Sequence, residues 1–296
     1  MSKNIVRVGA FCIASLAACG GGDNNDGGSS TVERTGPLPS DGVKEAGVYA
    51  LSVKGAEAPQ FSVQAEFIQG RMSSHGEECT TETKGSCTIR FCKEGNLPPP
   101  EVPHALMGAG AIAITGARLP ADHTYYAITQ GSAHPGITHD AITVWDGGEE
   151  IHVTAAGEAD GIPAFETTLN APSFVTMTTP IFAQKDMALD TSKDFEATWT
   201  HEGAGSGNVI LRFAQSATVA LKEVGQAVEC AYPASSDRGT IPASVLQRMK
   251  AYLTAAMDIT TREKRIVNAG DWKVEVNLGS RTGAGKDPGQ YSVNFN

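Results

Sequence analysis

The sequence has few positive charges and few aromatic side chains. Of its 296 residues, 23 are Lys or Arg and 33 are Asp or Glu, which gives a net charge of −10, and only 6% are aromatic. Proteins that bind nucleic acid need Lys and Arg surfaces that displace counterions from the phosphates. The acidic balance therefore excludes nucleic acid as an expected partner.

Long hydrophobic runs are also missing. The apolar segment near the N-terminus, residues 8–18, has eleven residues, whereas a membrane-spanning helix needs about 20. This segment follows Lys3 and Arg7, and no acidic residue precedes it. That order is typical of a secretory signal peptide. We therefore expect residues 1–18 to be removed on export.

The end of this leader carries a second signal. Residues 16–20 read Leu-Ala-Ala-Cys-Gly, which resembles a bacterial lipobox: a branched apolar residue and two small residues before a cysteine. The resemblance implies cleavage before Cys19 and a lipid on its thiol, so that the membrane is a partner through the anchor. Gly20, where an Asp would signal inner-membrane retention, implies the outer membrane or cell surface of a double-membrane bacterium.

The segment after the lipobox has no apolar side chain. Residues 20–30 read GGGDNNDGGSS, and such a segment cannot offset its ordering entropy by burial. We expect residues 19–40 to be a lipidated, flexible tether and residues 41–296 to form a single domain. An alternative division separates a disulfide-stapled subdomain at residues 41–97, just before the three consecutive prolines at 98–100.

Six cysteines are present, and the leader accounts for two. Cys12 leaves with the signal peptide and Cys19 takes the lipid. Four is an even number, which in an oxidising compartment predicts two disulfides. The four candidates are Cys79, Cys87, Cys92 and Cys230.

The pairing is partly constrained by strand geometry. Residues 87–92 read as a strand, in which side chains alternate, so Cys87 and Cys92 face opposite ways and do not pair. We expect one local bridge from Cys79 and one long-range bridge to Cys230, and the spacing leaves open whether Cys87 or Cys92 reaches Cys230. The alternative, a four-thiolate zinc site, usually uses C-x2-4-C pairs, whereas seven, four and 137 residues separate these cysteines.

Most of the chain alternates apolar and polar residues with period two, which predicts half-buried strands. Turn signals separate them, including residues 203–208, expected as a hairpin loop, and residues 279–289. Strands without intervening helices predict a mainly β protein, an antiparallel β-sandwich of immunoglobulin-like or jelly-roll-like type. The expected strands centre on residues 61–67, 142–144, 151–153, 165–169, 195–199, 209–213, 228–232, 272–278 and 291–295.

One segment has a different period. Between Pro242 and Met257, apolar residues recur at three- and four-residue intervals, including Val245, Leu246 and Met249. This pattern predicts one amphipathic helix of about four turns near 242–257, lying across the sandwich or capping an open end.

No complete catalytic motif occurs. An H-E-x-x-H motif starts at His201 but fails at Gly205, and no serine lies in G-x-S-x-G. We therefore expect no cofactor and assign no catalytic residue.

Charge is concentrated in one region. Residues 140–202 carry 12 acids and two lysines, a net of −10, whereas residues 246–286 carry eight bases and four acids, a net of +4. Acids in glycine-containing loops could supply oxygen ligands to Ca²⁺, and a solvated acidic rim is the favoured alternative. These weak calcium candidates are Asp146, Glu149, Glu150, Glu158 and Asp160.

Three further segments carry a resemblance in the body of the chain. Residues 161–165 (GIPAF), 228–234 (VECAYPA) and 239–243 (GTIPA) are similar to segments of uncharacterised myxobacterial-type surface lipoproteins. That resemblance implies a surface lipoprotein and no particular activity.

Two functions follow as hypotheses. The first is a lipid-anchored envelope module that binds or scaffolds a glycan or another envelope protein, with Tyr125, Tyr126 and Trp145 as candidate stacking groups. The alternative is an exported polysaccharide hydrolase, because glycosidases need two carboxyl groups across one bond. The acids considered for it are Glu149, Glu150, Glu158 and Asp160.

Overall fold

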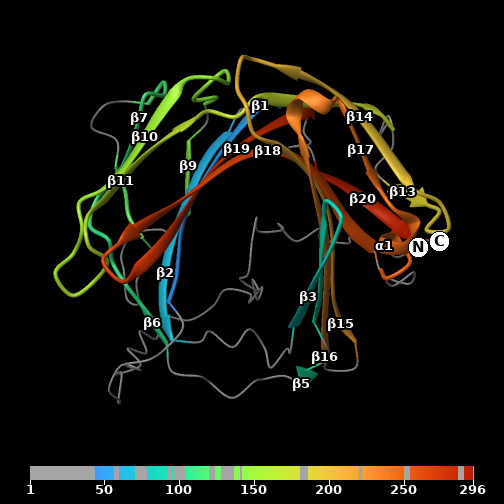
Figure 1. The fold of residues 1–296 in the computed structure, drawn as a ribbon, viewed down its shortest axis with the longest axis horizontal. Coiled ribbons are helices and arrows are strands. Elements are labelled where there is room, and N and C mark those ends of the chain that lie inside the picture. Colours follow the sequence, from blue (N-terminus) through green and yellow to red (C-terminus); the bar gives the residue numbers. More distant parts are fainter. Residues whose placement is uncertain are drawn as a thin grey trace, which may run out of the picture.

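The computed structural model describes residues 44–56, 60–70, 79–92, 95–96, 104–119, 124–127, 137–140, 142–180, 186–219, 222–249, 254–285 and 290–295. They form a mainly β protein whose sheets pack face to face, which confirms the predicted β-sandwich (Figure 1). Most strand pairs are antiparallel, and two pairs, β1 with β19 and β13 with β20, are parallel.

The largest sheet has thirteen strands. Its main path runs β3 (Cys79–Lys84), β4 (Cys87–Cys92), β16 (Lys222–Pro233), β15 (Asn208–Val219), β18 (Thr254–Ala269), β19 (Trp272–Gly285), β1 (Lys44–Ala56), β2 (Gln60–Gly70) and β6 (His104–Leu106). Four strands join from the side: β5 (Gly95–Asn96), β9 (Ile137–Asp140), β13 (Asp186–Leu189) and β20 (Gln290–Phe295).

Two smaller sheets cover the large one at its two halves (Figure 1). The first contains β11 (Phe165–Asn170), β10 (Glu150–Ala155), β7 (Ile112–Thr115) and β8 (Thr124–Tyr125). The second contains β12 (Phe174–Thr179), β14 (Phe195–Glu202) and β17 (Arg238–Ile241), next to the helix α1 (Ala243–Leu246) and the 3-10 helix η1 (Ala234–Ser236).

The buried apolar side chains form two clusters, one in each half. The first core joins β1, β2 and β19 to the four-stranded sheet and includes Phe61, Phe67 and Trp145. The second core joins β15, β16 and the start of β18 to the three-stranded sheet and includes Trp199 and Phe213. The alternation of the strands explains this arrangement, since β10 reads exposed, buried, exposed, buried along its length.

Eight of the nine expected strands are confirmed, and residues 142–144 are the exception. This segment is an irregular loop, whose Val144 N–H donates to Ser52 Oγ and whose Thr143 hydroxyl donates to the Val53 carbonyl oxygen. Two turn predictions are also wrong. The loop at 203–208 crosses between two sheets rather than closing a hairpin, and β19 continues through residues 279–285.

The predicted helix near 242–257 is wrong in its extent. A helix does start after Pro242, but α1 ends at Leu246, and β18 begins at Thr254. Residues 255–259 alternate, with Ala255, Met257 and Ile259 buried in the second core. Pairing with β20 and β15 therefore overrides the helical spacing of the apolar residues.

Candidate functional site

The most distinctive polar feature lies where the large sheet forks between the two cores. On one side of β18, residues 254–258 pair with β20, and residues 261–269 pair with β19. The two strands that pair with this side of β18, β20 and β19, therefore diverge near Thr260. Ser280 and Arg281 of β19 lie at this point and, as consecutive strand residues, face opposite sides of the sheet. We call the residues around this fork the junction.

On one side of the junction, Ser280 connects three segments through its hydroxyl. Trp145 Nε1 donates a hydrogen bond to Ser280 Oγ at 2.8 Å. Ser280 Oγ in turn donates to the carbonyl oxygen of Pro172 at 2.7 Å. Ser280 and Trp145 are fully buried, so this chain satisfies polar groups that have no access to water.

Three loops meet beside this serine, at residues 146–148, 171–173 and 203–207, and the first and third contain glycine. Gly148 N–H donates to the Ala171 carbonyl oxygen at 2.8 Å, and Ala204 N–H donates to the Gly147 carbonyl oxygen at 3.2 Å. Gly203 has a φ of +89°, and a Cβ there would lie 2.4 Å from the Asp146 carbonyl oxygen. The backbones approach so closely that only glycine fits.

The acidic residues of the first loop are engaged in holding it. Glu149 accepts hydrogen bonds from the backbone N–H groups of Asp146 (2.6 Å) and Gly147 (2.7 Å). Asp146 forms an ion pair with Arg118. These two calcium candidates therefore already have protein partners that stabilise the loop.

The other three calcium candidates lie elsewhere. Glu150 Oε1 lies 3.2 Å from Nε2 of His152 on β10. Glu158 belongs to a turn, in which its N–H donates to the Ile162 carbonyl oxygen, and Asp160 is exposed in the same turn. Within the described ranges, no three His, Cys, Asp or Glu side chains converge as metal ligands would.

The aromatic candidates divide between core and surface. Trp145 and Tyr125 are buried and pack edge to face on Phe61, with ring centroids 5.5 and 6.1 Å from it. Tyr126 is 40% exposed. Of the three residues considered for ligand stacking, only Tyr126 presents its ring to solvent.

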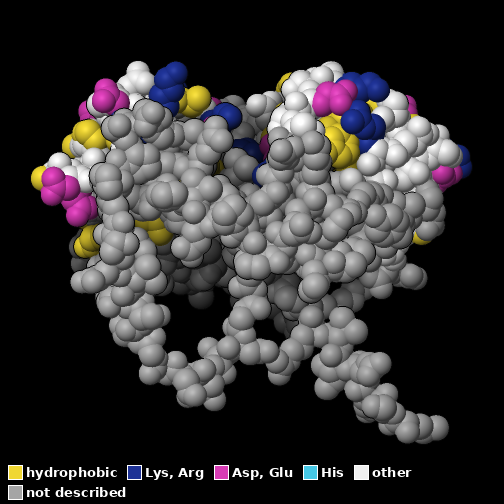
Figure 2. Space-filling view, turned by 90° about the horizontal axis from the view of Figure 1, so that it is seen from below, with side chains coloured by type: hydrophobic (Ala, Val, Ile, Leu, Met, Phe, Trp, Pro, Cys, Tyr) yellow, Lys and Arg dark blue, Asp and Glu magenta, His cyan; other side chains and the backbone are white. Residues whose placement is uncertain are grey.

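On the other side of the junction, a buried charge cluster fills the fork. Arg281, only 3% exposed, points both guanidinium Nε and Nη2 at Thr260 Oγ1, 3.4 and 3.2 Å away. Asp258 lies between two arginines, with Arg281 Nη2 at 3.6 Å and Arg212 Nη1 at 3.5 Å. Figure 2 shows Lys and Arg side chains in the recess between the two halves.

Sequence reasoning missed the junction residues. Asp258 follows a segment predicted as helix, and Ser280 and Arg281 fall in a segment predicted as a turn. The available signal was the period of β19, in which Val274, Val276 and Leu278 continue in register to Ser280.

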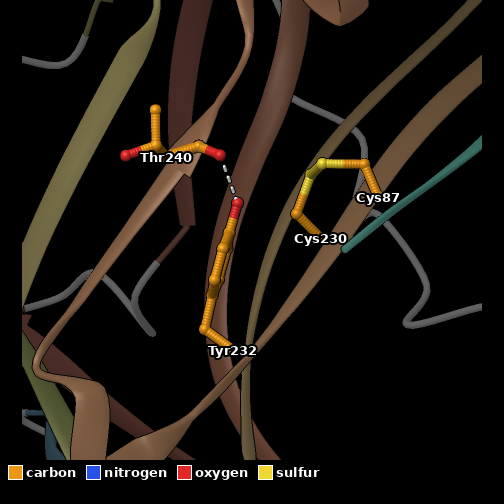
Figure 3. The surroundings of a disulfide bond; sticks show 4 residues. All are labelled: Cys87, Cys230, Tyr232 and Thr240. Carbon is orange, nitrogen blue, oxygen red and sulfur yellow. Dashed lines mark hydrogen bonds between the residues drawn. A yellow bond between two sulfur atoms is a disulfide. The ribbon is translucent and has the colours of Figure 1, made fainter. Parts of the chain in front are cut away.

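A disulfide links two strands that are distant in the sequence. Cys87 of β4 and Cys230 of β16 are bonded, with Cα atoms 3.9 Å apart, and both are buried in the second core (Figure 3). This bond decides which cysteine reaches Cys230. It also rules out the four-thiolate zinc site, because two of the four thiols are consumed.

Tyr232, two residues after Cys230, links β16 to β17 near the disulfide. Its hydroxyl donates to the Thr240 carbonyl oxygen at 2.5 Å (Figure 3). Burial raises the pKa of this phenol, so the hydroxyl stays protonated as a donor. Gly239 permits the contact, since a Cβ there would lie 2.6 Å from the Tyr232 ring.

Several sequence predictions lie outside the described residues. They are the signal peptide 1–18, Cys19 and the tether 19–40.

The structure places Cys79 and Cys92 in β3 and β4, where they are register partners. In the part of the chain that is described, no helix combines the length and apolar character needed to cross a membrane.

Comparisons with known proteins add little to this geometry. No family model matches the chain, and no curated protein matches it. Among solved structures, the N-terminal four immunoglobulin domains of Dscam1 isoform 8.4 are similar at 9% identity, over 83% of this chain and 74% of that one. The TM-score of 0.15 is too low to carry an argument, so the fold rests on the strand pairing and the two cores.

Proposed function

We propose that the protein is an exported, lipid-anchored module of the cell envelope that binds or scaffolds another envelope component. The leader and lipobox support export and anchoring through Cys19. The β-sandwich supplies a rigid body at the end of the tether. The favoured location is the outer membrane or cell surface, and the partner is an envelope protein or a glycan.

The Cys87–Cys230 bond is the observation that carries this proposal. It joins residues 143 apart in the sequence and is buried in a core. Disulfides of this kind form and persist in oxidising compartments outside the cytoplasm. The bond therefore supports the export that the leader predicts, and it does so from a different part of the chain.

The junction gives no support to the hydrolase alternative. Its charged side chains hold loops and strands together: Glu149 caps two backbone N–H groups, and Asp258 lies between two arginines. Glycoside hydrolysis needs two carboxyl groups facing one scissile bond. Of the four candidate acids, Glu149 and Glu150 instead have other partners, and Glu158 and Asp160 lie in a separate turn.

Metabolic labelling tests the anchor. Cells that express the full chain are grown with an alkyne-tagged palmitate, and the wild type is compared with Cys19→Ala. We expect label and membrane association in the wild type and loss of both in the variant. Cys12→Ala is the matched control, because Cys12 lies within the predicted signal peptide, and it should keep the label. Label that survives Cys19→Ala would overturn the anchor.

Binding is tested separately from anchoring. The mature protein is mixed with purified peptidoglycan sacculi or with lipopolysaccharide-containing vesicles and then sedimented. In parallel, a photo-crosslinking amino acid at the exposed Tyr126 captures envelope proteins in cells. We expect saturable sedimentation with one of the two materials or a discrete crosslinked partner. Failure in all three assays would contradict the binding proposal.

A further inference from the structure

The β3–β4 hairpin brings two cysteines directly opposite each other. Its two strands are joined by the two-residue loop Gly85-Ser86, and Lys84 lies opposite Cys87. At the far end of the same ladder, Cys79 lies opposite Cys92. On its other edge, β4 pairs with β16, and Cys87 lies opposite Cys230.

Ladder geometry tells which kind of pair Cys79 and Cys92 form. The residues that flank a two-residue hairpin loop form a hydrogen-bonded pair. Opposite pairs then alternate between hydrogen-bonded, with Cα atoms about 5.5 Å apart, and non-hydrogen-bonded, about 4.5 Å apart. Lys84 with Cys87 is the first pair, and Cys79 with Cys92 is the sixth. The cysteines therefore form a non-hydrogen-bonded pair.

The Cys87–Cys230 disulfide, across the other edge of β4, agrees with this alternation of pairs. If Cys87 turns its N–H and C=O groups toward β3, its pair with β16 must be non-hydrogen-bonded and close. The Cα atoms of Cys87 and Cys230 lie 3.9 Å apart, as this requires. For Cys79 and Cys92, the expected spacing of about 4.5 Å falls within the range of about 4.4–6.8 Å that disulfides span.

We propose that Cys79 and Cys92 form a second disulfide, across the hairpin and on the opposite face of the sheet from Cys87–Cys230. Cys87 and Ile89 are buried in the second core, so position 92, five residues from Cys87, lies on the other face. On that face Thr88 is exposed and Arg90 is half-buried. The two bonds fasten β4 to both of its neighbours.

Forming this disulfide is an oxidation, so the compartment must supply an oxidant. The two thiols lose two protons and two electrons as the sulfur–sulfur bond forms. The oxidant is the disulfide of an exported thiol–disulfide oxidoreductase, which is reduced to a dithiol in the exchange. Cys87–Cys230 has the same requirement, so the second bond needs no additional compartment.

The two bonds differ in how a reductant reaches them. Cys87 and Cys230 are buried, so their bond is attacked only when the core opens. The hairpin positions 80–84 beside the other bond are all exposed. With dithiothreitol under native conditions, we expect Cys79–Cys92 to be reduced about tenfold faster or more than Cys87–Cys230.

Peptide mapping tests the pairing directly. The exported full chain is blocked with N-ethylmaleimide, digested with trypsin without reduction and analysed by mass spectrometry. Cleavage after Arg71, Lys84, Arg90, Lys93, Lys222 and Arg238 puts each cysteine on a separate peptide. We expect peptide 72–84 linked to 91–93, and 85–90 linked to 223–238. Maleimide on Cys79 and Cys92, or any other partner for either, would overturn the proposal.

Cys92→Ser provides a second reading. In this variant, unfolded without reductant, Cys79 should react with maleimide, while the link between peptides 85–90 and 223–238 persists. Cys79 that is unreactive in this variant would contradict the pairing. Neither result depends on lipidation at Cys19, so failure of the anchor would be recognised separately.

Discussion

For single residues, two glycines distinguish the cost of a positive φ from the cost of close packing. Gly203 and Gly85 both have positive φ, but a Cβ at Gly203 would lie 2.4 Å from the Asp146 carbonyl oxygen, and at Gly85 it would meet no atom within 4 Å. Gly203→Ala should lower the free energy of unfolding by about 3 kcal/mol, and Gly85→Ala by about 1 kcal/mol. Urea denaturation measures both, and equal losses would contradict tight packing at the junction.

The Ser280 hydroxyl is a second test at this scale. Ser280→Ala leaves the Trp145 indole N–H and the Pro172 carbonyl oxygen without this partner in a buried site. We expect a loss of about 2 kcal/mol in the free energy of unfolding. Ser244→Ala is the control, because Ser244 is exposed and its hydroxyl accepts from Lys84 in an exposed contact. A loss at Ser280 no larger than at Ser244 would refute the role of this hydroxyl.

The buried charge cluster gives a third test. Arg281→Ala removes one of two guanidinium groups beside the buried Asp258, and breaking a buried pair costs about 3–5 kcal/mol. The control is Lys193→Ala, whose ion pair with Asp190 is exposed, so its loss should change stability far less. If adding Asp258→Asn to Arg281→Ala restores no stability, the two side chains are not coupled as the structure implies.

For secondary-structure elements, local patterns predict which segments are strands better than where those strands begin and end. Alternation identifies β10, β11 and β14 because each buries every second residue on one core. It fails at residues 254–257, where apolar spacing resembles a helix, and at residues 279–285, where glycines resemble a turn. Pairing with β15, β20 and β1 decides those segments, and none of these partners is near in the sequence.

The attachment of the β3–β4 hairpin is the prediction at this scale. Cys87–Cys230 ties β4 to β16 from within the second core. The double variant Cys87→Ala with Cys230→Ala should lower the free energy of unfolding by about 2–5 kcal/mol. Thermal denaturation of the oxidised proteins measures the loss. Wild-type stability in the double variant would show that the hairpin is held by other contacts alone.

At the scale of the whole molecule, composition and period suffice for the fold class but not for the arrangement. They predict a mainly β sandwich, and the structure confirms it. They do not predict one large sheet shared by two cores, because that depends on the parallel pairing of residues 46–56 with residues 274–285. The junction is hidden for the same reason, since Trp145, Pro172 and Ser280 meet only in three dimensions.

For the whole molecule, we propose that the mature chain is an anchored protein of an oxidising compartment. Intact mass spectrometry of the protein purified from membranes, alkylated before and after reduction, tests it most directly. We expect a chain that starts at a lipidated Cys19 and gains four alkyl groups only after reduction. A chain that retains residues 1–18 or carries no lipid, with its cysteines alkylated before reduction, would contradict it.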